Sequence, residues 1–281
     1  DNFLEELPKA ISIVKQPFWD LHWYYLVKKI KNFTNVFLSG DGGDELFAGY
    51  TFRYKKFLEL TTENSITHQK ILAYLDCHER DWVPDQEMIF GTDCHFDWKT
   101  IYSILEPYFN NSLPRLKQVL LADYNGKLRH NMQPLYSYIH EYFNVKNIVP
   151  IQNEQLIQYS CEMPNNLKYD LKTNTGKILL QKTIQKFDLG NLITDKKQGF
   201  SVNTVNLWNN YGKEIFLYYF DNSRLIQDKI INSDWIEKHI SKNDLDSRYV
   251  NKFLGILALE IWYRLFVTNE LDSNEKLQFK K

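Results

Sequence analysis

Cysteine, net charge and long apolar runs are all scarce in this sequence of 281 residues. Its three cysteines, Cys77, Cys94 and Cys161, form no CxxC pair and have no close histidine spacing, which disfavours a disulfide framework or a zinc site. The 34 basic and 35 acidic residues leave a formal net charge of -1 and are interleaved, so no nucleic-acid partner is expected. The most apolar stretch, residues 253–267, contains Glu260, and no secretory leader is visible. We therefore expect a cytoplasmic protein without membrane contact.

Hydrophobic and aromatic residues are abundant by contrast, at 43% and 15% of the chain. This content is enough to bury a sizeable core in one large domain or two small ones, and it excludes disorder. A cluster of metal-binding residue types occurs in DCHFD, residues 93–97, but adjacent residues do not share one helix face, so no metal site is expected there. The remaining histidines considered have no assigned role: His22, His78, His130 and His140.

The segment from Val36 to Tyr54, VFLSGDGGDELFAGYTFRY, is the most informative part of the chain. Its β-branched and aromatic run ends in glycines, which predicts a buried parallel strand that turns sharply into a helix, because glycine permits positive φ and close ligand approach. Asp44 and Glu45 would lie in the first helical turn, where free N–H groups favour negative charge or a cation coordinated by it. The pattern predicts a site for a nucleotide with magnesium.

This segment resembles the signature LSG-[ED]-G-x-DE-x-F-x-GY of the asparagine synthase family, which residues 38–50 match in order. Residues 148–168 resemble the family's RVPFLDHRLVEYALSLPPELK without a gap. Residues 175–184, TGKILLQKTI, resemble RTKYLLREAL, and residues 195–208, DKKQGFSVNTVNLW, resemble RPKQGFGVPLxxWL. The order of these segments along the chain is that of the family.

The resemblance implies a role for each matching site residue. Asp44 would coordinate Mg²⁺, Asp41 would face the amino-acid substrate, and Lys197 would stabilise negative charge on the phosphates of ATP or on the adenylate. Its neighbour Lys196 is the competing candidate for that last role. The residues expected to line the nucleotide are Leu38, Ser39, Gly40, Gly42 and Gly43.

The implied fold is an α/β domain with a parallel sheet of the adenine nucleotide alpha-hydrolase (PP-loop ATPase) kind. It would be truncated at its N-terminus and extended by a large, mostly helical C-terminal part, with residues 61–114 as a helical insertion. The family's SGGxDS pyrophosphate loop and N-terminal glutaminase domain are absent from residues 1–281. Gly176 and Lys177 do not replace that loop, because a Walker pattern needs glycine where Leu171 stands. Half of the ATP site is therefore expected to lie outside this chain, whose first residue is not a translational start.

Hydrophobic spacing predicts helices in most of the remaining chain. The segment before the glycine motif is expected to be an amphipathic crossover helix, and the last segment a core helix. The predicted helical segments are residues 20–33, 153–163, 175–187, 208–220 and 248–267.

One departure from the family falls just before the RVPF-like segment, where the family carries DRxSMAHSLEVR. Without a gap, Lys146 stands at the position of that glutamate and Ile148 at that of the arginine, and a lysine does not replace a carboxylate at neutral pH. A short insertion would instead align His140 and Glu141 with the family's histidine and glutamate. Glu141 is thus an alternative candidate, with a surface glutamate as the competing interpretation.

The function implied by the resemblance is ATP-dependent amide formation. Aspartate would become a β-aspartyl-adenylate, and ammonia from glutamine would displace AMP to give asparagine. The partners would be these small molecules, and a homodimer is one option for the assembly. Two alternatives stay open: a related adenylating amidotransferase that acts on another carboxylate, and a non-catalytic scaffold that kept the fold.

Overall fold

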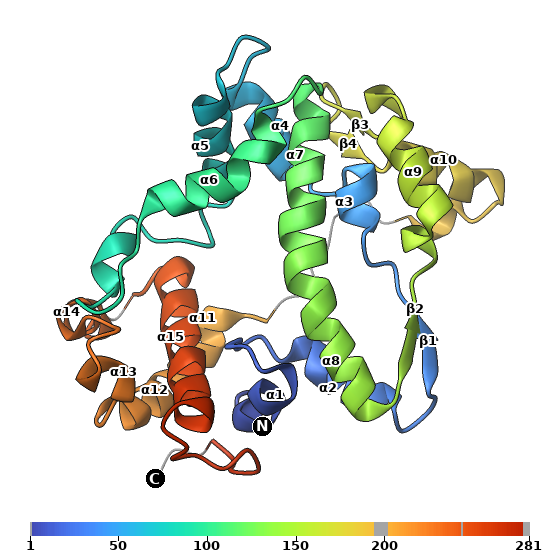
Figure 1. The fold of residues 1–281 in the computed structure, drawn as a ribbon. Helices are drawn as coiled ribbons and strands as arrows, with labels where there is room; N and C mark the ends of the chain where they lie inside the picture. The colour runs from blue at the N-terminus through green and yellow to red at the C-terminus, as the bar shows by residue number, and fades with distance from the viewer. Residues whose placement is uncertain (1, 194–201, 243, 278–281) are drawn as a thin grey trace.

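The computed structural model describes residues 2–193, 202–242 and 244–277. Helices predominate in these residues, and their strands form two sheets of two strands each. Figure 1 shows a long helical column through the middle of the molecule, with a helical bundle on one side and the small sheets on the other. Three clusters of buried apolar side chains lie around this column.

The column consists of α7 (Arg115–Ala122), the π-helical segment η2 (Asp123–Met132) and α8 (Gln133–Phe143), which follow one another without a break. The wider π turns immediately precede Pro134, which has no N–H for the helical hydrogen bond and whose ring crowds the preceding turn. π segments are rare and often occur at functional sites. This one carries Lys127.

Strand β1 (Val36–Leu38) pairs in parallel with β2 (Lys146–Ile148), as the motif predicts. The expectation that the strand is buried is wrong: the side chains of Val36 and Leu38 are 42% and 70% exposed. The reason is local. Only Phe37, between them, packs against the core, where its ring meets Trp23 and His140.

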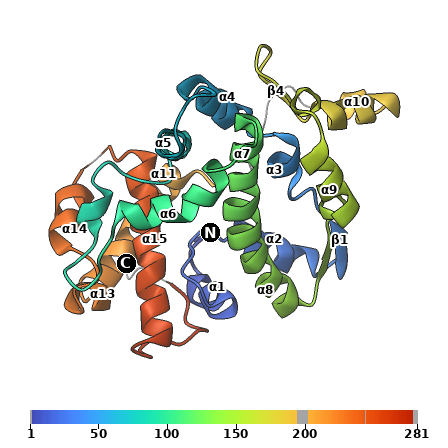
Figure 2. The same ribbon diagram turned by 45° about the horizontal axis from the view of Figure 1, so that its top comes forward.

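The glycine motif then leads into the short helix α3 (Gly43–Phe47), which lies between α7 and α9 (Glu154–Glu162) (Figures 1 and 2). Leu46 and Phe47 are buried there with Met163. Strands β3 (Tyr169–Asp170) and β4 (Thr175–Gly176) form the second sheet, which is antiparallel. Helix α10 (Ile178–Lys186) follows, so the helix expected over 175–187 begins later than predicted.

Residues 61–114 contain the helices α5 (Thr67–Cys77), η1 (Gln86–Ile89) and α6 (Trp98–Phe109). Their buried side chains pack with those of α4 and α7 in one cluster. This segment thus links α4 (Thr51–Leu60) to α7.

The bundle contains the largest core and includes the predicted N-terminal and C-terminal helices. The segment predicted to be a core helix forms the longest helix of the described residues. Its Glu260 is buried and accepts hydrogen bonds from Ser223 Oγ and from Arg264 Nε of the same helix. Among the described residues, no helix is both long and apolar enough to cross a membrane. The helices are α1 (Leu7–Val14), α2 (His22–Ile30), α11 (Thr204–Leu207), η6 (Trp208–Gly212), α12 (Lys213–Phe220), α13 (Arg224–Gln227), α14 (Ser233–Ile240) and α15 (Ser247–Phe266).

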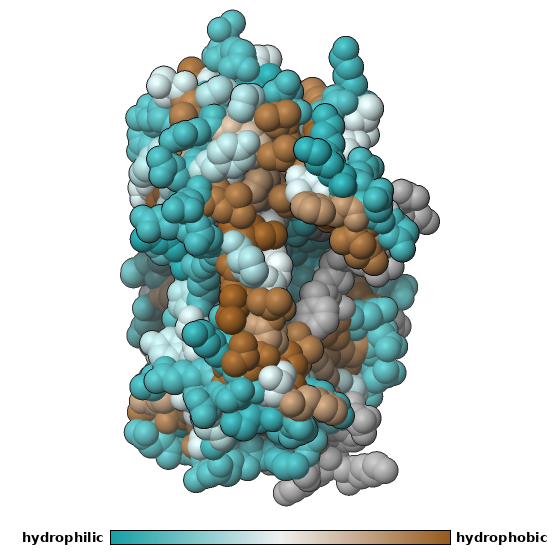
Figure 3. Space-filling view, turned by 90° about the vertical axis from the view of Figure 1, so that its right-hand side faces the viewer, coloured by the Kyte–Doolittle hydropathy of each residue, from teal (hydrophilic) through white to brown (hydrophobic). Residues whose placement is uncertain are grey.

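The face formed by β1, β2, α9 and α10 carries a band of apolar surface around a hollow (Figure 3). Exposed apolar side chains of these elements include Val36, Leu38, Ile148, Tyr159 and Ile184. Two clefts of the structure are lined by residues of the glycine motif.

Candidate active site

The turn after β1 is held by side chains from the segment around β2. Ser39 Oγ donates to Asp41 Oδ2 at 2.8 Å, and Asn147 Nδ2 donates to Ser39 Oγ at 3.0 Å. Gln152 Nε2 donates to the Asp41 carbonyl oxygen at 3.1 Å. The sequence interpretation missed both Asn147 and Gln152, although Asn147 stands in the strip aligned with the family's DRxSMAHSLEVR. These bonds fix the direction of the Asp41 carboxylate.

Gly42 is required by the backbone of this turn. Its φ is +87°, in the left-handed region, and an added Cβ would lie 3.0 Å from Gln152 Cγ and 3.2 Å from Leu128 Cδ2. At Gly40, an added Cβ would meet no atom within 4 Å. The turn is therefore tight at Gly42 and open at Gly40, on the side where a ligand could approach the backbone.

Asp44 forms an ion pair with Lys177, with 2.7 Å between Oδ1 and Nζ. Both residues line a cleft of about 550 Å³, the Lys177 cleft, together with Gly40, Gly43 and the residues around β4. Lys177 has a φ of +53°, and its N–H donates to the Phe47 carbonyl at 2.8 Å. A strained backbone of this kind is retained where surrounding contacts demand it, and it often occurs at functional sites. Sequence reasoning tested Lys177 only as a Walker lysine, and so missed it.

A second cleft, the Lys127 cleft, has a volume of about 750 Å³ and lies against the same turn. Asp41, Asp44, Tyr50 and Lys127 line it, together with aromatic residues that include Trp23. Lys127 Nζ lies 3.7 Å from the centre of the Tyr50 ring, a cation–π contact. Burial lowers the pKa of Lys127 to about 8, and the nearby Arg53 charge acts in the same direction. This cleft thus combines the Lys127 cation with three carboxylates, those of Asp20, Asp41 and Asp44.

Glu45, the third acid of the motif, lines neither cleft. It is 3% exposed, and Tyr50 OH donates to its Oε1 at 2.6 Å. Burial raises the pKa of Glu45, although the bond from Tyr50 opposes that effect. Asp44 is therefore the acid of the motif that lines both clefts. A polyanion with its cation in one cleft could meet a second molecule in the other cleft at this residue.

A buried network supports the helix that carries Lys127. Asp123 is fully buried and accepts hydrogen bonds from Tyr54 OH at 3.1 Å and Tyr74 OH at 2.8 Å. His78 Nε2 lies 3.4 Å from Asp123 Oδ1, and its Nδ1 lies 3.1 Å from Asp81 Oδ2. Burial alone would lower the pKa of His78, but the two carboxylates outweigh burial and Arg53, and the pKa is raised.

This network makes stability depend on pH. Because the pKa of His78 in the folded protein is above its unfolded value of about 6.5, its contribution is fully present below that pH and is lost as the pH rises through the folded pKa. We expect the free energy of unfolding to fall between about pH 6 and pH 8, and to fall less in His78→Gln. Urea unfolding of both proteins at the two pH values checks this, and equal falls would contradict it.

The structure brings together most of the residues that the motif singled out, from Ser39 to Asp44. Leu38 points from β1 with 70% exposure and lines neither cleft. Lys196 and Lys197 lie outside the described residues. Glu141 and Lys146 are exposed and line neither cleft. Within the described residues, no group of three or more His, Cys, Asp or Glu that could hold a metal ion is found.

Comparison with known proteins identifies the family. The family model described as asparagine synthase matches residues 1–264. The chain belongs to the asparagine synthase family. This asparagine synthase family chain is also similar to asparagine synthetase [glutamine-hydrolyzing] 1 of Bacillus subtilis (strain 168), with 23% identity over 300 aligned positions. The alignment covers 94% of the chain and 46% of the relative, so the chain spans about half the length of the curated relative that it matches.

Proposed function

We propose that this chain is the synthetase part of an ATP-dependent ligase that activates the side-chain carboxylate of aspartate as an acyl-adenylate. Ammonia, supplied by glutamine, attacks the activated carbonyl and displaces AMP, which gives asparagine. Pyrophosphate leaves in the first step. Family membership supports the reaction class, and the acid–lysine pair in the Lys177 cleft is the observation that carries the assignment of the site.

The pair suits a magnesium-bound triphosphate. The Asp44 carboxylate is a hard oxygen donor of the kind that Mg²⁺ takes alongside phosphate oxygens. Mg²⁺ would neutralise charge on the phosphates as pyrophosphate leaves. Lys177 Nζ lies 2.7 Å from Asp44 Oδ1. The Lys177 ammonium group could also pair with a phosphate oxygen and would then stabilise the negative charge on the departing pyrophosphate. The open backbone at Gly40 would let the nucleotide approach the turn, with Ser39, Gly42 and Gly43 beside it.

The Lys127 cleft suits the carboxylate substrate. Asp41 is oriented there by Ser39, and we propose that its carboxylate binds the substrate's α-ammonium group. Lys127 would balance the negative charge of a substrate carboxylate beside it. The substrate carboxylate would then meet the α-phosphate near Asp44, the residue that lines both clefts.

Asp41→Asn keeps the shape of the side chain but removes its charge. We expect the KM for the carboxylate substrate to rise by about tenfold, because a charge-assisted bond is lost, with little change in the KM for ATP. Glu141→Gln is the matched control, since Glu141 is exposed and lines neither cleft, and its kinetics should stay within about twofold of wild type. A tenfold effect in the control alone would transfer the role to Glu141.

The size of the Lys127 cleft favours a second candidate substrate class. Its volume of about 750 Å³ is in the range of sites for drug-sized ligands and exceeds what aspartate needs. An adenylating amidotransferase for a larger carboxylate would use the same first step.

Isotope transfer tests the proposed reaction. Aspartate labelled with ¹⁸O in its side-chain carboxylate would be incubated with ATP, Mg²⁺ and ammonia and the protein as its gene encodes it. Formation of an acyl-adenylate transfers one ¹⁸O atom to AMP, which mass spectrometry detects. Label that appears in inorganic phosphate with ADP would overturn adenylation, and label transfer only from a larger carboxylate would select the second candidate.

A further inference from the structure

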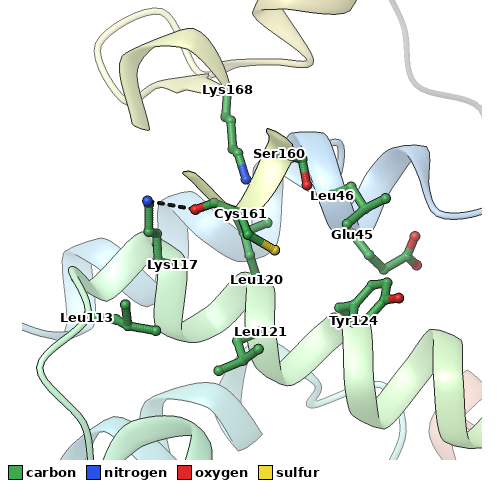
Figure 4. A pocket seen from close by; sticks show the side chains of 10 residues that line it. All are labelled: Glu45, Leu46, Leu113, Lys117, Leu120, Leu121, Tyr124, Ser160, Cys161 and Lys168. Carbon is green, nitrogen blue, oxygen red and sulfur yellow. Dashed lines mark hydrogen bonds between the residues drawn. The ribbon is translucent and has the colours of Figure 1, made fainter. Parts of the chain in front are cut away.

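A further cavity, the Lys168 pocket, lies between α3, α7 and α9 (Figure 4). It has a volume of about 150 Å³, and its lining is mainly apolar. None of its lining residues lines the Lys177 cleft or the Lys127 cleft. The lining residues are Glu45, Leu46, Leu113, Lys117, Leu120, Leu121, Tyr124, Ser160, Cys161 and Lys168.

The pocket contains a buried cation. Lys168 is only 4% exposed, and Figure 4 shows its side chain extending toward Ser160 and Cys161. No hydrogen bond or ion pair to its ammonium group is found within residues 2–193, 202–242 and 244–277. Burial lowers the pKa of Lys168 to about 8; Cys161 opposes this shift, whereas Lys117 adds to it. Burial in apolar surroundings is unfavourable for a charge, so an anion that enters the pocket would stabilise the protonated lysine.

The polar groups around the pocket make hydrogen bonds of their own. Lys117 is a second cation at the pocket, and its Nζ donates to the Cys161 carbonyl at 2.8 Å (Figure 4). Ser160 Oγ is bonded to the Ile157 carbonyl, and the Glu45 carboxylate is bonded to Tyr50. The backbone of Lys168 is fixed as well, since its N–H donates to Asn165 and its carbonyl accepts from Ile178. The backbone that carries the Lys168 side chain is thus fixed beside an apolar space.

We propose that the Lys168 pocket binds a small organic monocarboxylate with a compact apolar body. The carboxylate pairs with the Lys168 ammonium, and the apolar body contacts Leu46, Leu120 and Leu121. A cavity of this volume accommodates a benzene-sized body. This binding site is independent of the function proposed above, because it uses none of the residues of the two clefts.

Protonation of Lys168 predicts how binding depends on pH. The other titratable groups that face the pocket are Lys117, Glu45, Tyr124 and Cys161. With a pKa of about 8, Lys168 is mostly protonated near pH 7 and mostly neutral near pH 9.5. Affinity for a carboxylate should therefore fall by at least about tenfold over this range, whereas affinity for a neutral analogue should not change.

Calorimetric titration with benzoate, with benzyl alcohol as the neutral analogue, tests the proposal. In wild type we expect saturable benzoate binding near pH 7 that weakens by at least about tenfold near pH 9.5. Lys168→Met should weaken benzoate binding by at least about tenfold and remove its pH dependence. Lys117→Met, at the same pocket but with its ammonium bonded to a carbonyl, should weaken it by less than about threefold.

Two further results decide the case if Lys168→Met does not fold. Leu121→Phe leaves the lysine in place but fills the opposite wall, and it should abolish benzoate binding. The pH dependence in wild type needs no variant at all. Absence of saturable binding, or binding that is equal at both pH values and in Leu121→Phe, would overturn the proposal.

Discussion

Asp44→Asn is expected to lower magnesium-dependent ATP–pyrophosphate exchange by about 10³-fold, while the protein remains folded. The substitution keeps the shape of the side chain but removes the charge that would hold the cation. It also removes the ion pair with Lys177, so the lysine loses its anchor in the cleft. Exchange of labelled pyrophosphate into ATP, measured on the protein as its gene encodes it, gives this ratio directly.

Asp221→Asn is the matched control for that experiment. Asp221 is an exposed aspartate just after α12, in the bundle, and it lines neither the Lys177 cleft nor the Lys127 cleft. We expect its exchange rate to stay within about twofold of wild type. Wild-type exchange in Asp44→Asn would contradict the assignment of Asp44 to the metal.

Gly176→Ala is expected to reduce the free energy of unfolding by roughly 2 to 4 kcal/mol. Gly176 is buried where β4 passes the end of α3, and an added methyl group would overlap the carbonyl oxygen of Ala48. The same group would lie 3.0 Å from the Ala48 carbonyl carbon and 2.9 Å from Thr51 Cγ2. Because the obstacle is backbone, no side-chain rotation relieves it, and the two segments must move apart.

Gly126→Ala provides the comparison. Gly126 lies in η2, where an added Cβ meets no atom within 4 Å, so alanine should be neutral or stabilise by up to about 1 kcal/mol. Urea unfolding of the two variants and wild type measures both effects. An equal stability of Gly176→Ala and wild type would contradict the close contact between β4 and the Ala48 carbonyl.

The parts of the site that sequence could predict are those whose cause is local. The turn at Gly42 needs a residue that tolerates positive φ, and the adjacent acids follow it directly, so the motif predicts both the strand–turn–helix and the position of Asp44. The parallel pairing of β1 was also predictable. Its exposure was not, because burial depends on which elements cover the faces of Val36 and Leu38.

The contacts that complete the site are not local. Lys177 reaches Asp44 only because β3 and β4 turn the chain back toward α3, and no spacing in the sequence expresses that distance. Lys127 lies in η2 and lines its cleft with Asp41 and Asp44 from a distant part of the chain, and Lys168 is buried beside α7 and α9. A lysine in a sequence is normally expected to be exposed, so the positions of Lys127 and Lys168 could be found only from the structure.

ATP–pyrophosphate exchange across a panel of carboxylates tests the central claim most directly. The protein as its gene encodes it would be assayed with Mg²⁺ and with aspartate, glutamate and larger carboxylates, alongside the 281-residue chain. The account predicts exchange that depends on a carboxylate, with aspartate preferred, in the gene-encoded protein. If none of the carboxylates supports exchange, the claim is contradicted and the scaffold alternative remains.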